Sequence, residues 1–562
     1  MDVVEMLFEV FGGLGIFLLG MKNMSEGMQA VAGERLRKLI GAVTRNRFLA
    51  CGVGTAVTSI IQSSSITTVM VVGMVNAGIM TLVQAIGVIM GANIGTTMTA
   101  WILTFSLDKY GLPMLGIAAL FFVFTKRDRI RFTAMFFVGL GMVFYGLQLM
   151  KVGFSPIKDL PGFIEWFHRF EPSTYFGLLK CCMVGAVLTA VIQSSSATIG
   201  ITMALAFSGA IDYQTSAALV LGENIGTTIT AWLASLGTSA NARRAAYAHM
   251  LFNIIGVLWM TSVFHWYTDG VVWFVKTFQH VQGPDVAVYT DSVVSYPYTQ
   301  AAIAATHSGF NILNTLFFLP LVGVMARFLN WAVKEQKTPA TPRLTYLDVR
   351  LFDTPSIGLE QSDNEVVKMG RRVIRMFDQL RDIFVTGNLA PEKIEPIFQG
   401  ENDLDIVQKE VVEFIGHIMV GNITHETMQT AREQLRMADE FESISDYIAT
   451  ITKLRLKMKD TNQSLSPEAM EEILGLHDRV SRYIVNVTDA VESENAAFLS
   501  EAMTKGNAVT QYMKECRNKH LIRVSEGKAT PLKSLIYTDM LTSYRRIKDH
   551  AFNISEVLAG EK

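Results

Sequence analysis

The chain has 562 residues, of which 50% are hydrophobic, and a formal net charge of −2. A net charge so close to neutral does not suggest a nucleic-acid partner, and we expect none. The four cysteines lack the spacing of a disulfide framework or a zinc site, and we expect them to be small buried residues.

Long apolar runs recur from about residue 6 to residue 326, after which the composition becomes that of a soluble helical protein. Runs approaching about 20 apolar residues are typical of transmembrane helices. We therefore predict an all-α protein with a multi-pass membrane domain over 1–334, a linker over 335–360 and a helical bundle over 361–562. The acidic N-terminus does not resemble a signal peptide, and we interpret its first apolar run as a retained helix.

The membrane domain contains an internal repeat. Residues 54–101 align without a gap to residues 185–232, and the repeat as a whole extends over about 48–104 and 174–236. Each copy carries Gln-Ser-Ser-Ser and, after the same interval, Gly-x-Asn-Ile-Gly-Thr-Thr. Two motifs matched twice at identical spacing are not explained by chance. Their polar members are the candidate binding residues: Gln62, Ser63, Ser64, Ser65, Asn93, Thr96, Thr97, Gln193, Ser194, Ser195, Ser196, Asn224, Thr227 and Thr228.

Basic clusters at 33–47, 126–131 and 241–244 predict the membrane orientation, because such clusters favour the cytoplasmic side. The N-terminus is then outside and the tail cytoplasmic. Re-entrant hairpins are expected over 48–80 from the cytoplasm and over 174–210 from outside, so the second repeat is inverted. The remaining predicted elements are spans at about 82–104, 110–125, 131–150, 213–236, 244–264 and 300–326, and a long loop over about 265–300.

Hairpin tips with this composition suit an anion and a small cation. A helix that begins at such a tip presents free N–H groups, and its dipole favours negative charge. Serine hydroxyls both donate and accept hydrogen bonds, while amide and hydroxyl oxygens suit Na⁺ better than a soft metal. No Lys or Arg lies between Phe48 and Ser106. An anion bound there therefore depends on helix dipoles and co-bound cations.

Two further features leave alternatives open. Glu223 occupies the position of Ala92 in the first copy, and it either contacts a cation or pairs with His249 or Arg243. The segments 249–253 and 307–311 share His-x-x-Phe-Asn. These side chains either hydrogen-bond the hairpins or make an ordinary interhelical contact.

The duplicated Gln-Ser-Ser-Ser tips and the GANIGTT and GENIGTT segments resemble the bacterial type II sodium–phosphate cotransporters. The resemblance covers roughly residues 5–330. It implies sodium-coupled transport of inorganic phosphate across the bacterial cytoplasmic (inner) membrane. It also implies that the two tips meet at the midplane to hold phosphate and sodium, through the candidate residues above. Glu223 departs from many copies of the motif and leaves the stoichiometry open.

The tail is predicted to form six helices, near 361–387, 392–418, 425–457, 466–493, 495–523 and 532–558. Segments 438–451 and 543–554 resemble the two signature helices of PhoU, a phosphate-regulatory protein. In that family an acidic pair four residues apart binds metal, which implies a divalent or ferric ion at Glu442 and Asp446. Asp549 fits the second copy, but Arg545 replaces its acidic partner. The alternative is a solvated acidic face.

The resemblance therefore predicts a sodium–phosphate symporter with a PhoU-like regulatory tail. Phosphate export, and a phosphate sensor built on a transporter fold, remain alternatives, and a homodimer is left open. A membrane enzyme is not expected, because the sequence displays no catalytic constellation.

Overall fold

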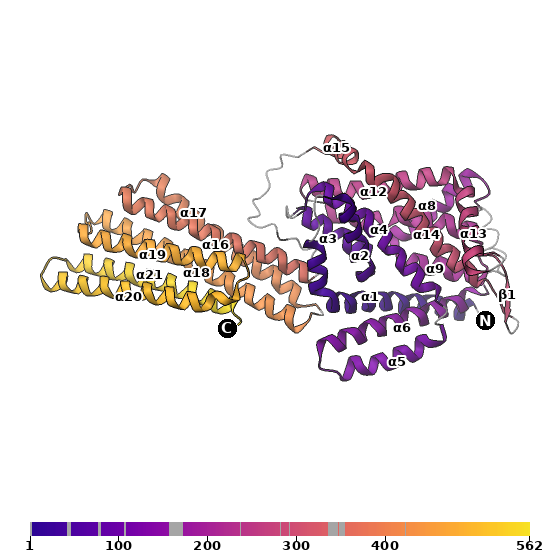
Figure 1. The fold of residues 1–562 in the computed structure, drawn as a ribbon, viewed down its shortest axis with the longest axis horizontal. Helices are drawn as coiled ribbons and strands as arrows, with labels where there is room; N and C mark the ends of the chain where they lie inside the picture. The colour runs from indigo at the N-terminus through magenta and orange to yellow at the C-terminus, as the bar shows by residue number, and fades with distance from the viewer. Residues whose placement is uncertain are drawn as a thin grey trace. The chain divides into compact units, whose positions relative to one another are not determined.

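A computed structural model describes residues 3–41, 46–76, 80–105, 108–156, 172–236, 238–280, 283–290, 293–334, 347, 355–421 and 423–561. These residues are almost entirely helical, which confirms the predicted all-α class apart from one short β-hairpin. Residue contacts divide the chain into two units, Met1–Thr338 and Pro339–Lys562 (Figure 1). Most of the predicted linker lies outside the described residues, and helix α16 begins at Pro355 rather than at residue 361.

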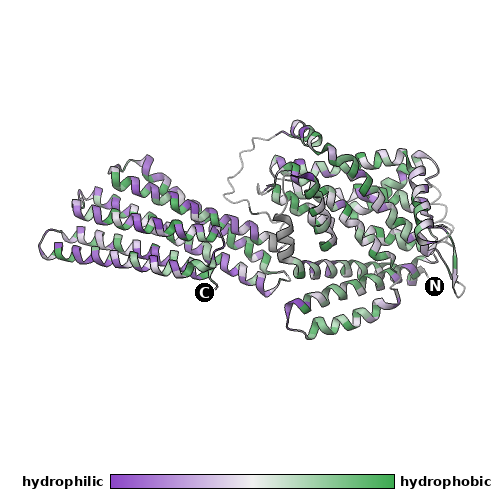
Figure 2. Ribbon diagram, in the orientation of Figure 1, coloured by the Kyte–Doolittle hydropathy of each residue, from purple (hydrophilic) through white to green (hydrophobic). Residues whose placement is uncertain are grey.

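The first unit is the apolar one, and its helices are mostly green in Figure 2, whereas the helices of the second unit mix green with purple. Among the described residues, six helices are long and apolar enough to cross a membrane. The helices of the first half are α1 (Val3–Gly41), α2 (Arg47–Ile61), α3 (Ser64–Asn76), α4 (Leu82–Thr104), α5 (Asp108–Phe124) and α6 (Asp128–Phe154). Those of the second half are α8 (Tyr175–Ile192), α9 (Ser195–Ser208), α10 (Tyr213–Gly226), α11 (Thr228–Ser235), α12 (Ala240–Ser262), α13 (Phe264–Gln279), α14 (Pro297–Phe318) and α15 (Val322–Ala332).

Helices α1 and α6 pack closely along a ladder of glycines. A Cβ placed on Gly20 would meet the backbone of Gly139 and Val143 at 2.7–2.8 Å, and one placed on Gly13 would meet Gly146 O at 2.8 Å. Small residues at such crossings let two backbones approach, and close packing is a main source of helix association in lipid. This pair forms one side of the unit, with α5 packed on α6 (Figure 1).

The two repeats pack internally through matching glycines. In the first copy, a Cβ on Gly54 or Gly91 would overlap the carbonyl of Val88 or Cys51, which joins α2 to α4. In the second copy the same overlaps involve Gly185 with Leu219 and Gly222 with Cys182, which joins α8 to α10. All four pairs align under the repeat spacing, so the duplicated sequence produces duplicated helix packing.

The two hairpins are connected to opposite ends of α12. Ser239, the N-cap of α12, donates its backbone N–H to Asn76 Oδ1 at the end of α3, at 2.9 Å. At the other end of α12, residues 261–266 line a pocket of about 330 Å³ together with Thr174 and Tyr175, where α8 begins. The first hairpin therefore ends beside the N-terminus of α12, and the second begins beside its C-terminus.

The prediction of a long loop over 265–300 is wrong. This stretch contains α13 and a hairpin of β1 (Val288–Thr290) and β2 (Val293–Ser295), which pair antiparallel. The apolar face of α13 was overlooked: Phe264, Val271 and Val275 recur at helical spacing and are buried, while two tryptophans of the same helix are exposed. Polar residues interleave this apolar face in the sequence, but they do not prevent the face from packing.

Two predicted spans are interrupted. The span at 213–236 is divided at Thr227 into α10 and α11, and the span at 300–326 continues past a 3-10 turn, η2 (Leu319–Leu321), into α15. The second interruption has a clear cause, since Pro320 has no N–H to continue the helical ladder. The helical hydrogen bonds continue up to each break, since Thr227 N–H donates to Glu223 O at 3.0 Å and Leu319 N–H donates to Thr315 O.

The second unit is a helical bundle in which all six predicted helices are present. They are α16 (Pro355–Thr386), α17 (Pro391–Met419), α18 (His425–Asp460), α19 (Pro467–Glu492), α20 (Leu499–Ser525) and α21 (Pro531–Leu558), with a short turn η4 (Ala496–Phe498) before α20. The predicted apolar face of α18 is confirmed, because Phe441, Ile444 and Ile448 are fully buried. Helix α18 packs against α16, α17 and α21.

Candidate functional site

The first hairpin turns at Gln62, which is the C-cap of α2 in the left-handed conformation (φ 60°, ψ 24°). A non-glycine residue there costs about 1–2 kcal/mol, so the surrounding structure must hold it in place. Its N–H donates to Thr58 O at 2.7 Å. Helix α3 then begins at Ser64, and Ser63 Oγ accepts the N–H of Ile66 at 3.3 Å.

The second hairpin turns in the same way at Gln193 (φ 57°, ψ 25°). Its N–H donates to Thr189 O at 2.7 Å, and Ser194 Oγ accepts the N–H of Ala197 at 3.3 Å, which caps α9. Every one of these contacts is the counterpart of a contact in the first hairpin. Both tips therefore present the N-terminus of a helix, whose first N–H groups have no partner within the helix.

The glutamine side chains of the two tips differ. Gln62 is buried, accepts a hydrogen bond from Thr99 Oγ1 at 3.0 Å and donates to Ser59 O. Ser25 of α1 also donates to Ile61 O at 2.7 Å, next to this tip. Gln193 is exposed, and Thr230, the counterpart of Thr99, donates to its own helix at Thr227 O. The first tip is thus fastened by side chains that the sequence analysis did not single out.

The side chains of the second motif form the same hydrogen bonds in both copies, although α4 is continuous there and the second copy is divided at Thr227. Asn93 and Asn224 each donate Nδ2 to the carbonyl four residues earlier, at 2.9 and 2.8 Å. The threonine hydroxyls of both copies also donate to carbonyls of their own helices: Thr96 to Ala92, Thr97 to Ile94, Thr227 to Glu223 and Thr228 to Ile225. All six side chains are buried. Their oxygens keep lone pairs that remain able to bind a cation.

The repeats pack against each other in a reciprocal way. Helix α3, which follows the first tip, contacts α11, which begins at Thr228 of the second repeat. Helix α9, which follows the second tip, contacts α4, which carries Asn93 and its neighbours. Each hairpin thus packs against a helix of the other repeat that contains or directly follows the second motif. Figure 1 places α2, α3 and α4 together and α8, α9 and α14 together.

One of the His-x-x-Phe-Asn segments contacts the site. Asn311 of α14 donates Nδ2 to Asn224 Oδ1 at 3.1 Å, so this segment reaches the second motif rather than a hairpin tip. Asn253 in the other segment bonds to its own helix at His249 O. In the part of the chain that the structure describes, neither ring nitrogen of His249 has a hydrogen-bond partner.

Glu223 is fully buried in α10. Its Oε1 accepts a hydrogen bond from Thr202 Oγ1 of α9 at 2.9 Å, and within the described residues its Oε2 has no hydrogen-bond partner. The hydrogen-bond partner of the Glu223 carboxyl is therefore Thr202, and neither His249 nor Arg243, the two partners considered from the sequence. The threonine was missed because its own position does not belong to either motif.

The acidic residues of the tail lie on two helices. On α18, burial raises the pKa of Glu442, with Asp446, Asp405 and Asp439 adding to the rise. On α21, Asp549 forms ion pairs with Lys548 at 2.5 Å and with Arg545 at 3.5 Å. Over the described ranges, no three His, Cys, Asp or Glu side chains come together as a metal site. Metal binding by this unit stays a prediction.

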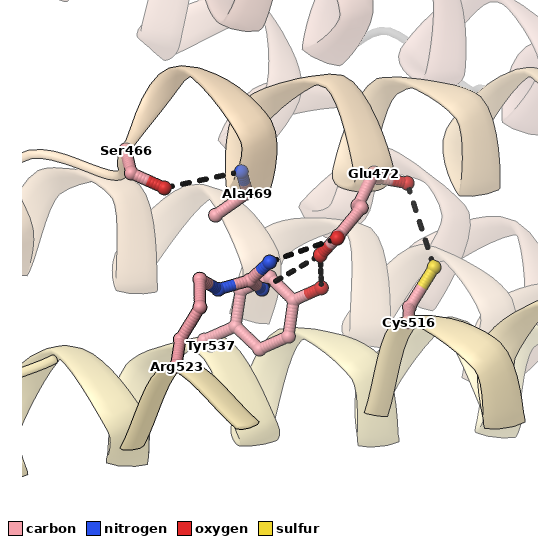
Figure 3. A network of polar contacts seen from close by, with 6 residues as sticks. All are labelled: Ser466, Ala469, Glu472, Cys516, Arg523 and Tyr537. Carbon is pink, nitrogen blue, oxygen red and sulfur yellow. Dashed lines mark hydrogen bonds and ion pairs between the residues drawn. The ribbon is translucent and has the colours of Figure 1, made fainter. Parts of the chain in front are cut away.

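The second half of the tail contains a polar network that sequence patterns did not indicate (Figure 3). Glu472 of α19 accepts two hydrogen bonds from Arg523, at 2.8 and 2.7 Å, and one from Tyr537 at 2.5 Å. Burial alone raises the pKa of this carboxyl, but the three hydrogen bonds outweigh burial and lower it. Because every charge has a partner, the network ties three helices together rather than forming an open site.

Sequence comparison gives two family matches. The model of the Na+/Pi-cotransporter family matches residues 16–152 and 171–273, and that of the PhoU domain matches residues 366–454. The first match includes both hairpins and both copies of the second motif. The second match includes most of α18, with Glu442 and Asp446, whereas Asp549 lies beyond it.

Three relatives illustrate the range of similarity. "Putative inorganic phosphate export protein YjbB" of Escherichia coli is 24% identical over 476 residues, which is 84% of this chain and 82% of that protein. "Uncharacterized protein YqeW" of Bacillus subtilis is 30% identical over 314 residues, 56% of this chain and 94% of that protein. "Sodium-dependent phosphate transport protein 2B" of Homo sapiens is 36% identical over 95 residues, 16% of this chain and 14% of that protein.

Proposed function

This chain belongs to the Na+/Pi-cotransporter family and carries a PhoU domain, and from that premise we propose that it couples sodium ions to the movement of inorganic phosphate. The membrane is the bacterial cytoplasmic membrane, and the tail lies in the cytoplasm. Phosphate and Na⁺ are held between the two Gln-Ser-Ser-Ser tips, which we assign to re-entrant hairpins of two inverted repeats.

The observation that carries the proposal is the duplicated tip. Gln62 and Gln193 share a left-handed conformation that side chains rarely adopt, and a serine-capped helix follows each of them. Two helix N-termini offer N–H donors and partial positive charge to one anion. Four phosphate oxygens require many donors, and Ser64, Ser195 and Ser196 supply hydroxyl groups at the same helix starts.

Inverted topology is supported by the connections to α12. The first hairpin ends at the N-terminus of that helix and the second begins at its C-terminus. If α12 crosses the bilayer, the hairpins open to opposite sides, as alternating access requires. The reciprocal packing of α3 on α11 and of α9 on α4 is what a two-fold exchange of equivalent elements produces.

The proposed coupling of phosphate transport to sodium is supported by the charge balance of the site. No Lys or Arg lies between Phe48 and Ser106, or between Cys181 and Ala242. A buried phosphate without a basic partner is costly, and co-bound cations offset that cost. Amide, hydroxyl and carbonyl oxygens from both copies of the second motif are the hard ligands that Na⁺ prefers.

Export is the second candidate direction. It is favoured by the relative named as a phosphate export protein, whose alignment spans 84% of this chain.

Removing the tail separates the role of that unit from transport. We expect a chain ending at residue 334 to carry phosphate but to lose its response to cytoplasmic phosphate. Unchanged flux at every phosphate concentration would show that the tail does not regulate transport.

The test of the proposal is labelled-phosphate flux in proteoliposomes, with the sodium gradient directed inward, directed outward or absent. We expect flux driven by sodium in the wild-type chain and its loss in both Gln62→Ala and Gln193→Ala. Ser262→Ala, an exposed residue that bonds its own helix, is the matched control and should transport normally. Phosphate binding without sodium-driven flux in the wild type would instead indicate a sensor.

A further inference from the structure

The repeats differ at several positions, and one of these differences is a pair of facing positions inside their cores. Glu223 on α10 aligns with Ala92 on α4, and both are fully buried. Thr202 on α9 aligns with Val71 on α3, and both are again buried. The second repeat therefore carries a carboxyl and a hydroxyl in contact, where the first repeat carries two apolar side chains.

This carboxyl is incompletely satisfied. Thr202 Oγ1 donates to Oε1 at 2.9 Å, and Oε2 has no hydrogen-bond partner among the residues that the structure describes. A buried carboxylate that lacks a partner is costly and is retained when a cation or another group completes it. Glu223 is also adjacent in the chain to Asn224, whose amide oxygen is bonded by Asn311. The unpaired oxygen thus lies on the same turn of helix as the proposed binding motif.

We infer that Glu223 and Thr202 form a sodium-binding subsite that the second repeat has and the first repeat lacks. This inference rests on the proposed function and adds to it that the two repeats contribute unequally to coupling. A carboxylate and a hydroxyl are hard oxygen ligands, which suit an alkali cation. The negative charge of Glu223 also sets this subsite apart from the neutral oxygens of the duplicated motifs.

A structural role makes a different prediction. If Glu223 only fills space and accepts the bond from Thr202, then Glu223→Gln should behave as the wild type, because the amide has the same shape and keeps an oxygen. The first repeat provides a built-in replacement, since Glu223→Ala with Thr202→Val recreates its Ala92 and Val71 pair. Both variants remove the negative charge. Glu223→Gln keeps the shape of the side chain, and the double variant copies the apolar packing of the first repeat.

The experiment measures how many sodium ions accompany each phosphate. Proteoliposomes are held at a fixed phosphate gradient, and the sodium gradient at which net flux reverses is recorded. We expect Glu223→Gln and the double variant to couple one sodium ion fewer than the wild type. At a tenfold sodium gradient their limiting phosphate accumulation should then fall about tenfold, because each coupled ion contributes one factor of its gradient. Ser262→Ala should keep the wild-type ratio.

An unchanged sodium-to-phosphate ratio in both variants would overturn the inference. So would variants in which only the pH dependence of phosphate flux changes, because the bound cation would then be a proton. If the wild-type chain shows no sodium-driven flux, the proposed function itself is wrong, and this result can be told apart from a failure of the subsite alone. A binding measurement covers variants that fold but do not transport. Sodium chloride, compared with choline chloride, should raise the melting temperature of the wild type more than that of Glu223→Gln. An equal rise would count against the subsite.

Discussion

The two repeats of the membrane unit share the backbone geometry of their hairpin tips but differ in the side chains around those tips. In both, a left-handed glutamine ends one helix and a serine caps the next. In the first, Gln62 is buried and fastened by Thr99, whereas Gln193 in the second is exposed. In the second, Glu223 replaces Ala92. The duplication has therefore preserved the geometry of the hairpins while the groups around each tip have diverged.

The common backbone has a physical cause in the helix crossings. Gly91 lies against Cys51 O, and Gly222 lies against Cys182 O, so closely that no side chain fits at either position. A crossing fixed by backbone contact cannot shift without separating the helices. Side chains at the tips are free of that constraint, which explains why Gln62 and Gln193 can share a backbone and differ in burial.

The largest predicted effect comes from breaking this shared geometry. Gly222→Leu should separate α8 from α10 at a cost of about 3 kcal/mol or more, because the added side chain overlaps backbone rather than a movable group. Gly91→Leu should do the same to α2 and α4. The measurement is the yield of monodisperse protein in detergent and its melting temperature.

Gly52 provides the control, since a Cβ there would have no neighbour within 4 Å although the residue belongs to α2. Gly52→Ala should leave the melting temperature unchanged or raise it slightly. If Gly91→Leu and Gly222→Leu folded as well as Gly52→Ala, the crossings would not be the feature that the repeats share.

The next effect concerns phosphate binding. Ser64→Ala and Ser195→Ala remove equivalent hydroxyls from the two helix starts, and each should weaken phosphate binding by about ten- to a hundredfold, the range for a hydrogen bond to a charged group. Equilibrium binding of labelled phosphate to purified protein measures this. Unchanged affinity in both variants would exclude the tips as the phosphate site.

Much of the fold was predictable from the sequence, because long apolar runs and periodic apolar faces decide where helices form. The helices on both sides of Gln62 and Gln193 follow from the duplicated motifs, and the tail helices from capping and periodicity. The exception is α13, whose apolar face is interleaved with polar residues, so that the sequence predicts a loop where a helix forms. The role of the tip residues in binding stays a prediction.

Contacts between distant segments were not predictable. Thr99 is 37 positions from Gln62, and Thr202 is 21 positions from Glu223. Neither threonine belongs to a duplicated motif, and a hydroxyl in an apolar helix most often bonds to its own backbone, as Thr230 does. Aligning the repeats does supply one usable indication, which is that Thr202 and Glu223 both replace apolar residues of the first copy.

A smaller effect sharpens the difference between the tips. Thr99→Val removes the hydroxyl that bonds to Gln62 and should cost about 1 kcal/mol at that tip, which corresponds to a several-fold weaker phosphate affinity. Thr230→Val, at the equivalent position of the second repeat, removes only a bond within its own helix and should change affinity little. Equal effects of the two substitutions would mean that fastening of Gln62 does not matter for binding.

The smallest effect extends the comparison to the tail, where duplicated acidic positions have also diverged. Burial raises the pKa of Asp446, with nearby Asp405 adding to the rise and Lys453 opposing it, whereas Asp549 is neutralised by Lys548 and Arg545. For an acid whose folded pKa is raised, the ionised form destabilises the fold, so stability is gained as the pH falls through the folded pKa. Asp446→Asn should therefore stabilise the full chain at neutral pH by only a few tenths of a kcal/mol, since the residue is exposed to solvent, which screens its charge.

Asp549→Asn should destabilise slightly, because it removes two surface ion pairs. Thermal unfolding of the full-length chain at neutral pH and at about pH 5, with and without Mn²⁺, measures both. If Asp446 binds a metal with Glu442, Mn²⁺ should stabilise the wild type and not Asp446→Asn, and the substitution then loses its advantage once metal is present. Stabilisation of Asp446→Asn that is independent of metal would instead assign these residues to a solvated acidic face, and the two copies would differ in charge balance alone.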